Sequence, residues 1–159
     1  MIALNVRPAT PTDAALLARL NDFVHAVHAA ERPDVFRADP PATELTSIFD
    51  GLLARENAVA FVAESSGRPI GYATATLHHR QGDALTRPRS FVFLEHLAVD
   101  PEAGRAGVGT ALVDAVRTAG RDAGCSAFLT DVWDFNKNAL AFFEAVGFAP
   151  MRRFLEQPL

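Results

Sequence analysis

The chain has 159 residues, and 15 Lys and Arg against 19 Asp and Glu give it a net charge of −4 at pH 7. Apolar residues make up 49% and charged residues 21%, a composition typical of globular proteins. This length predicts one domain, residues 1–159, because a domain commonly holds about 100–200 residues. The single cysteine, Cys125, excludes an internal disulfide framework and a multi-cysteine zinc site, and no metal is expected.

Charge and hydropathy also limit the expected partners and location. The acidic balance argues against nucleic acid as a standing partner, because surfaces that bind phosphate backbones are basic. No apolar run approaches the ~18 residues that a membrane helix needs, so no membrane partner is expected. The first residues lack the basic start and apolar core of a signal peptide. Together these features predict a cytoplasmic protein.

The first third of the chain predicts one strand and two helices. A strand is expected over Ala3–Pro8, and a helix is expected from Thr10 to a point before Pro33. A capping Thr, a Pro at the first helical position and Asp13 three residues after the cap are signals of a helix start. A second helix is expected after Pro40, where apolar residues recur at helical spacing.

The remaining chain alternates between strand and helix patterns. The predicted elements are strands Ala58–Glu64, Pro69–His78 and Ser90–Val99, helix Gly107–Gly124, strand Cys125–Trp133, helix Asn136–Val146 and a last strand Phe148–Leu155. A polar loop separates the second and third of these strands. The order β-α-α-β-β-β-α-β-α-β predicts an α+β fold, a mixed sheet with helices on its faces.

A glycine-rich turn between a strand and a helix is the most informative segment. Gly104, Gly107 and Gly109 stand between the strand that ends at Val99 and the helix that continues from Thr110. Glycines let a ligand approach the backbone closely, and the free amides and dipole of a helix start favour anions. The segment therefore predicts a phosphate site, composed of Gly104, Arg105, Ala106, Gly107, Val108, Gly109 and Thr110.

Several interpretations of this turn compete. A Walker A loop needs a Lys before the Ser or Thr, and none precedes Thr110. A dinucleotide fingerprint needs Gly-x-Gly-x-x-Gly in an early βαβ unit, whereas Gly-x-x-Gly-x-Gly stands late in this chain. A sharp turn without a ligand is the remaining alternative.

Two spaced motifs resemble the GNAT superfamily of N-acetyltransferases. The first is Leu94–Pro101 followed by Gly104–Thr110, the second is Asn136–Phe148, and the opening Arg7–Thr10 also resembles that of the family. The resemblance spans essentially the whole chain. It implies a central, mostly antiparallel sheet that splays between its fourth and fifth strands and is flanked by about four helices.

The resemblance also implies a cofactor and a reaction. Acetyl-CoA is the expected co-substrate, with its pyrophosphate on the glycine turn and its thioester carbonyl on backbone amides of Leu97, Ala98 and Val99. Asn136 or Asn138 is expected to bind the pantetheine arm, although Asn is also a good helix cap. A bound primary amine on a small molecule or peptide would attack the thioester directly in a ternary complex.

The sequence departs from the family pattern at two positions. Gly104 stands where the family usually has Arg or Gln, and the positive charge is one place later at Arg105. Phe143 stands where many members have a Tyr that protonates the leaving thiolate. Phe143 can pack against pantetheine but has no proton to donate, and the only Tyr, Tyr72, lies on an earlier strand.

Glu95 is the predicted general base, with a structurally paired or solvated glutamate as the alternative. An alkyl ammonium with a pKa of about 10.4 must lose a proton before it attacks. Strand alternation places Glu95 on one face with Phe93, and His96 on the opposite face, where a packing role is expected.

The acceptor is expected to lie against the first two helices. His25 and His28, one turn apart, together with Glu31 and His78, are the predicted substrate-binding residues. A second hypothesis, motivated by the missing Tyr, is a non-catalytic module that binds acyl-CoA as a sensor or partner. The family often dimerises through its C-terminal strands, so the resemblance also implies a possible homodimer through Met151–Leu159.

Overall fold

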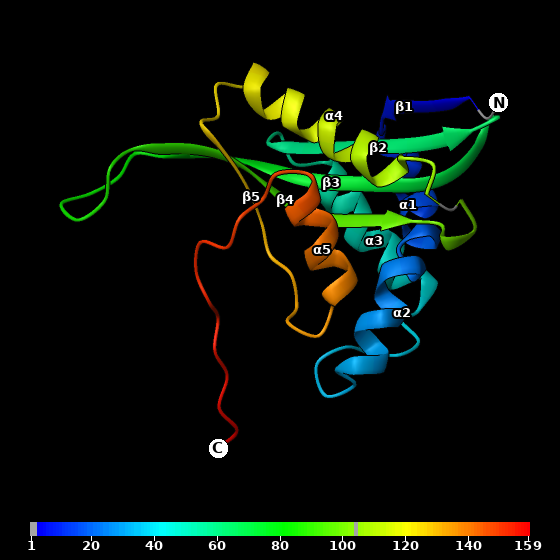
Figure 1. Cartoon of the computed structure of the whole chain (residues 1–159). Coiled ribbons are helices and arrows are strands. Elements are labelled where there is room, and N and C mark those ends of the chain that lie inside the picture. The colour runs from blue at the N-terminus through cyan, green and yellow to red at the C-terminus, as the bar shows by residue number, and fades with distance from the viewer. Residues whose placement is uncertain (1–2, 104) are drawn as a thin grey trace.

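The computed structural model describes residues 3–103 and 105–159, which form a five-stranded sheet between two layers of helices (Figure 1). In chain order the elements are β1 Leu4–Pro8, a 3-10 turn Pro11–Asp13, α1 Ala14–Leu20, α2 Asp22–Glu31, α3 Ala42–Leu53, β2 Ala58–Ser65, β3 Arg68–Arg80, β4 Arg89–Val99, a 3-10 turn Pro101–Ala103, α4 Val108–Asp122, β5 Ala127–Thr130 and α5 Lys137–Ala145. No helix among the described residues is both long and apolar enough to cross a membrane.

The sheet is mixed, as the resemblance predicts. Its strand order is β1-β2-β3-β4-β5, with antiparallel neighbours except for β4 and β5, which run parallel. The β4–β5 pairing runs only from Phe91↔Ala127 to Leu94↔Thr130, whereas β4 continues to Val99. The two strands therefore separate beyond Leu94, which confirms the predicted splay.

Two hydrophobic layers hold the sheet between the helices. Alternation along β2 and β3 places Val62 and Tyr72 on one face and Ala63 and Ala73 on the other. The first face packs against α1 and α3, and the second packs against α4 through residues such as Leu112. Because both faces are buried, each strand is fixed in register by its apolar side chains.

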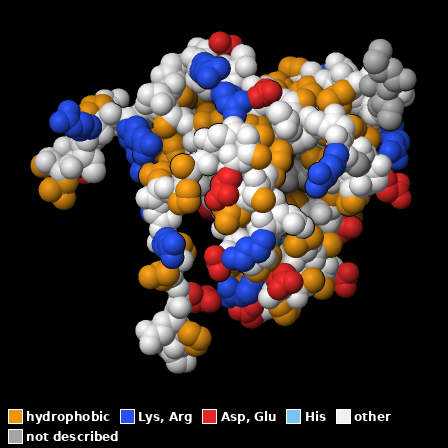
Figure 2. Space-filling model, in the orientation of Figure 1, with side chains coloured by type: hydrophobic (Ala, Val, Ile, Leu, Met, Phe, Trp, Pro, Cys, Tyr) orange, Lys and Arg blue, Asp and Glu red, His pale blue; other side chains and the backbone are white. Residues whose placement is uncertain are grey.

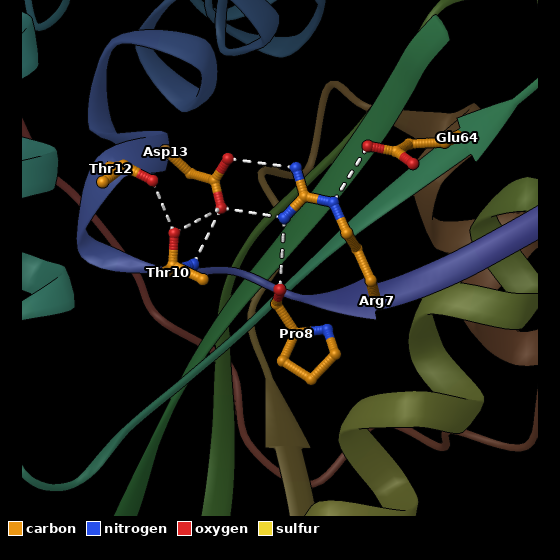
Figure 3. Close-up of polar contacts among 6 residues, drawn as sticks. All are labelled: Arg7, Pro8, Thr10, Thr12, Asp13 and Glu64. Atoms are coloured by element: carbon orange, nitrogen blue, oxygen red, sulfur yellow. Dashed lines mark hydrogen bonds and ion pairs between the residues drawn. The ribbon is translucent and has the colours of Figure 1, made fainter. Parts of the chain in front are cut away.

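The start of the first helix is fixed by an ion-pair network that joins it to the sheet edge (Figure 3). Arg7 Nη1 and Nη2 donate to the two carboxylate oxygens of Asp13 at 2.9 and 3.0 Å, and Arg7 Nε donates to Glu64 Oε1 at 2.9 Å. The Asp13 carboxylate also accepts from the Thr10 amide at 2.7 Å, as the capping pattern predicts. The hydrogen bonds from Arg7 hold the pKa of Asp13 below its usual range.

Two boundaries differ from the sequence prediction. The helix expected from Thr10 to a point before Pro33 is divided at Asn21 into α1 and α2, so the described residues form five α-helices where about four were expected. The strand expected over Cys125–Trp133 is confined to Ala127–Thr130, because β4 and β5 diverge there. Gly104 lies outside the described residues.

The predicted last strand over Phe148–Leu155 is wrong. The chain after α5 has no regular structure and extends along one side of the molecule (Figure 1), where Glu156 pairs with Arg32. Pro150 cannot donate to a strand ladder, and a strand forms only where a neighbouring strand supplies hydrogen bonds. Within the described residues no strand pairs with this segment.

Candidate active site

A cavity of about 1080 Å³ opens where β4 and β5 separate. Its walls come from α2, the loop after α2, α3, β4, the start of α4, the segment after β5, and α5. Single-ligand pockets commonly measure about 300–1,000 Å³, so this cavity lies just above the upper end of that range. Thirteen predicted site residues line it: His25, His28, Glu95, Leu97, Val99, Arg105, Gly107, Val108, Gly109, Thr110, Asn136, Asn138 and Phe143.

One end of the cavity is formed by the start of α4. Gly107 caps this helix with a φ of 78°, a conformation that glycine adopts without strain. The amides of the first turn have no acceptor within the helix, and the positive end of the helix dipole lies behind them. Gly109 allows close packing against α5, since a Cβ there would lie 3.1 Å from Phe142 Cζ. This end suits a phosphate group, with Arg105 beside it.

The α5 wall carries both predicted asparagines and Phe143. Asn136 is the N-cap of α5, and its Oδ1 accepts from the Ala139 amide at 3.1 Å. Asn138 is exposed on the same wall, so its amide is available to a ligand. Phe143 is buried and packs edge-on against Phe142 and Phe148. This wall therefore offers one free amide and an aromatic surface.

A β-bulge on β4 corrects the predicted orientation of His96. Thr74 pairs with His96 and Ala75 with Leu94, so Glu95 is an extra residue without a partner on β3. An extra residue reverses the alternation beyond it. Glu95 and His96 consequently lie on the same face, that of Thr76, and both line the cavity.

Glu95 is held by a buried neighbour. Thr76 Oγ1 donates to Glu95 Oε1 at 2.9 Å, and Thr76 itself is buried. Arg55 Nη1 lies 4.0 Å from the same oxygen on an exposed side chain. The hydrogen bond from Thr76 thus orients the Glu95 carboxylate, and Glu95 remains part of the cavity wall.

His96 belongs to a buried hydrogen-bonded chain that the sequence did not predict. Asn21 Nδ2 donates to the Tyr72 hydroxyl at 2.8 Å, and that hydroxyl lies 3.4 Å from His96 Nδ1. Burial lowers the pKa of His96 and raises the pKa of Tyr72, so both side chains are neutral near pH 7. Tyr72 lies behind His96 and packs against Phe49, away from the cavity wall.

The other end of the cavity is aromatic. His28 stacks on Phe36 with centroids 5.2 Å apart, and Phe36 packs edge-on against Trp133 at 5.4 Å. These contacts bring the loop after α2 to the segment after β5. His25 Nε2 lies 2.6 Å from the Arg37 carbonyl oxygen, which fixes the same loop to α2. Burial lowers the pKa of His28.

Four other predicted site residues do not line the cavity. Glu31 is exposed at the end of α2. His78 stacks on Phe91 with ring centroids 4.8 Å apart, and neither Glu31 nor His78 is part of the cavity wall. Ala98 is buried with Tyr72 in the layer under α1 and α3. Ala106 is exposed and lies outside the wall. Among the described residues no group of three or more His, Cys, Asp and Glu is placed to hold a metal.

The family model described as the acetyltransferase (GNAT) family matches residues 22–148, most of the chain. The chain belongs to this GNAT family. An aminoglycoside N(6')-acetyltransferase type 1 of Stenotrophomonas maltophilia is 34% identical over 159 residues, covering 99% of this chain and 95% of the relative. An N-acetyltransferase 8 of Homo sapiens is 30% identical over 106 residues, covering 67% of this chain and 45% of the relative.

Solved structures agree with this GNAT assignment. A tetramutant of the BH1408 protein from Bacillus halodurans superposes with a TM-score of 0.91 at 28% identity, covering 98% of this chain and 99% of that one. Aminoglycoside N-acetyltransferase AAC(6')-Iy in complex with CoA superposes with a TM-score of 0.80 at 21% identity, covering 100% of this chain and 96% of that one. The second likeness establishes the fold.

The GNAT chain is an N-acetyltransferase that transfers an acetyl group from acetyl-CoA to a primary amine. The alternative of a non-catalytic acyl-CoA module has no support in these relatives. Sequence reasoning missed Asn21, Phe36 and Tyr72, which come from three separate segments, whereas Trp133 was expected near the cleft, at the end of the strand before Asn136. Only the fold shows that Trp133 contacts Phe36 in the loop after α2.

Proposed function

We propose that the acceptor is the primary amine of a small molecule, which binds in the cavity beside Glu95 while acetyl-CoA binds against α4 and α5. One observation carries this proposal: the helix start suited to phosphate, the Glu95 carboxylate and the aromatic end share one cavity of about 1080 Å³. Proximity in one cavity lowers the barrier to reaction between two bound ligands, so the proposed reaction is direct transfer without an acyl-enzyme.

Acetyl-CoA is proposed to lie along the α4 and α5 walls. Its pyrophosphate would bind the amides of Val108, Gly109 and Thr110 and the glycine turn before them, with Arg105 adding positive charge. The Asn138 amide is free to bond the pantetheine arm, because Asn136 already caps its helix. The Phe143 ring would pack against the same arm.

Glu95 is proposed to accept the proton that the ammonium of the acceptor loses. The free amine then attacks the thioester carbon, a C–N bond forms, and the C–S bond breaks. The nitrogen loses its second proton as the amide forms, and the CoA thiolate takes up one proton. The balance is one ammonium and acetyl-CoA giving one amide, CoA thiol and one proton released. Phe143 supplies no acid, which is tolerable because a thiol has a pKa of about 8.5 and leaves readily.

Replacement of Glu95 by Gln tests this assignment. The change keeps the shape and an acceptor for Thr76, so we expect unchanged acetyl-CoA affinity by calorimetry and a kcat lower by about 10²–10⁴-fold at neutral pH. The control Glu56→Gln alters an exposed glutamate outside the cavity wall and is expected to be silent. A Glu95→Gln enzyme with the pH–rate profile of the parent would remove Glu95 from the mechanism.

Aminoglycosides are the first acceptors to test, because the relative from Stenotrophomonas maltophilia is named for that activity. The test is release of CoA thiol over a panel of amines that includes aminoglycosides, simple amines and a lysine peptide. Turnover of the peptide alone would contradict a small-molecule acceptor.

We further propose that residues 1–159 act as one domain in a cytoplasmic homodimer. Phe154 is 97% exposed in the C-terminal tail, Met151 and Leu155 are also exposed, and β5 is an edge strand of the sheet. Figure 2 shows apolar side chains along the extended tail. A second copy would cover these apolar groups. Light scattering should give a dimer mass for the parent protein and a monomer mass for the double variant Phe154→Asp, Leu155→Asp. A monomeric parent protein would refute the dimer.

The single domain and the cytoplasmic location have separate tests. One cooperative unfolding transition is expected if residues 1–159 form one domain. Recovery of the native protein with membranes or in secreted fractions would contradict the cytoplasmic location.

A further inference from the structure

The aromatic end of the cavity combines exposed apolar surface with few free charges. Val35 is 50% exposed, Ile48 59% and Trp133 36%, and all three line the cavity from different segments. Large apolar side chains exposed together in a concave site indicate a ligand that covers them. These residues, with Phe36 and Leu45, form the wall opposite the α4 end.

The rings at this end are arranged as a surface for a flat group. Trp133 stacks on Phe135 with an interplanar angle of 21°, and Phe36 meets Trp133 edge-on at 74°. Edge-on and stacked rings are the geometries that aromatic groups prefer, so a ligand ring would meet the exposed part of this surface in the same geometries. His28, with its pKa lowered by burial, adds a neutral ring rather than a charge.

The carboxylates near the rings already have cationic partners. Glu44 Oε2 accepts from Arg37 Nη1 at 3.2 Å. Arg32 lies over the Trp133 ring at 5.1 Å and pairs with Asp34 at 2.7 Å and Glu156 at 3.1 Å. A polycationic ligand would have to compete with these arginines for every one of those carboxylates.

Few negative charges therefore remain for an acceptor. Of the cavity-lining residues that the structure describes, three are acidic: Glu44, Glu95 and Asp131. Glu44 is paired, and Glu95 is the proposed base, which leaves Asp131 without an ion-pair partner among the described residues. The cavity thus offers the Glu95 carboxylate to the reacting ammonium. Asp131 is the one carboxylate among the described lining residues that remains for a further cation.

We infer that the acceptor of this enzyme carries its primary amine on an apolar, ring-bearing body, with at most one further positive charge. The inference rests on the proposed function, since it assumes that the acceptor amine lies beside Glu95. The amine reaches Glu95 while the ring packs against Trp133 and Phe36, and the carboxylates already paired with arginine are less available to a polycation.

A comparison of 2-phenylethylamine with kanamycin tests the inference in the CoA-thiol release assay. The monocationic aromatic amine should have a kcat/KM at least about tenfold higher than the polycation. Trp133→Ala should raise the KM for 2-phenylethylamine about tenfold with kcat and acetyl-CoA affinity little changed, since the ring contact is made before and during reaction. Trp133→Phe should restore most of the affinity, and Leu85→Ala, at the exposed hairpin tip, serves as the control.

The outcomes distinguish the aromatic acceptor from the more general proposal of a small-molecule acceptor. Preference for kanamycin, or an unchanged KM in Trp133→Ala, overturns the aromatic acceptor and leaves a small-molecule acceptor in place. Failure of both amines while acetyl-CoA binds and a lysine peptide is acetylated overturns the small-molecule acceptor and this inference together.

Discussion

The ion-pair network around Asp13 allows a quantitative test of how the fold is held. Asp13→Asn removes the charge that accepts two hydrogen bonds from Arg7, at 2.9 and 3.0 Å, and weakens the bond from the Thr10 amide. The Asp13 side chain is 10% exposed and that of Arg7 32%. Breaking a buried ion pair costs about 3–5 kcal/mol and an exposed pair about 0–1 kcal/mol, so we expect a loss of about 2 kcal/mol.

The loss should depend on pH in a defined direction. The pKa of Asp13 is lowered by Arg7, whereas the unfolded value is about 3.9. Between the folded and unfolded pKa the unfolded state binds more protons, so the stabilisation is complete above about pH 4 and is lost as the pH falls through the folded pKa. The difference between parent and Asp13→Asn should therefore be largest at pH 7 and shrink below about pH 4.

Urea unfolding followed by circular dichroism at pH 7 and at pH 3 measures both effects. For a chain of this size a loss of about 2 kcal/mol also lowers Tm by about 4–8 °C. Asp134→Asn is the matched control, because Asp134 forms only an exposed pair with Lys137 at 3.4 Å and should change stability by less than about 0.5 kcal/mol. A loss below about 0.5 kcal/mol for Asp13→Asn, or an equal difference at the two pH values, would refute the reasoning.

Three further predictions follow from the backbone and from buried histidine. Gly107→Val should lower acetyl-CoA affinity in calorimetry, whereas Gly124→Val, at a similar positive φ of 80° but outside the cavity, should strain the fold without affecting binding. Gly120→Ala should cost about 1–3 kcal/mol in urea unfolding, because its Cβ would lie 2.6 Å from Val92 Cγ1; Gly51→Ala in open space on α3 should not destabilise. Because burial lowers the pKa of His96, the native state binds fewer protons than the unfolded state below about pH 6.5, so stability should fall from pH 7.5 to pH 5.5 and fall less in His96→Gln.

Local patterns were sufficient for the order of most elements. Helix starts, turns and glycines depend on residues that are close in sequence, so the capping pattern of Thr10 and Asp13 and the turn at Gly107 were predictable. The prediction of a strand over Phe148–Leu155 was wrong because a strand needs a hydrogen-bonding partner. The alternation of these residues does not show whether a partner strand lies beside them. His96 was assigned to the wrong face because one unpaired residue, Glu95, reverses the alternation, and bulges leave no clear mark in a sequence.

The sequence by itself determined the glycine turn, the helix behind it and the carboxylate on β4, because each arises from a short segment with its own geometry. The aromatic end of the cavity was decided only by the tertiary structure. Phe36 and Trp133 meet across almost a hundred residues, and Tyr72 reaches His96 only through the antiparallel pairing of β3 and β4. Packing of both sheet faces brings these groups together, and their burial then sets which side chains are neutral and which carboxylates remain free.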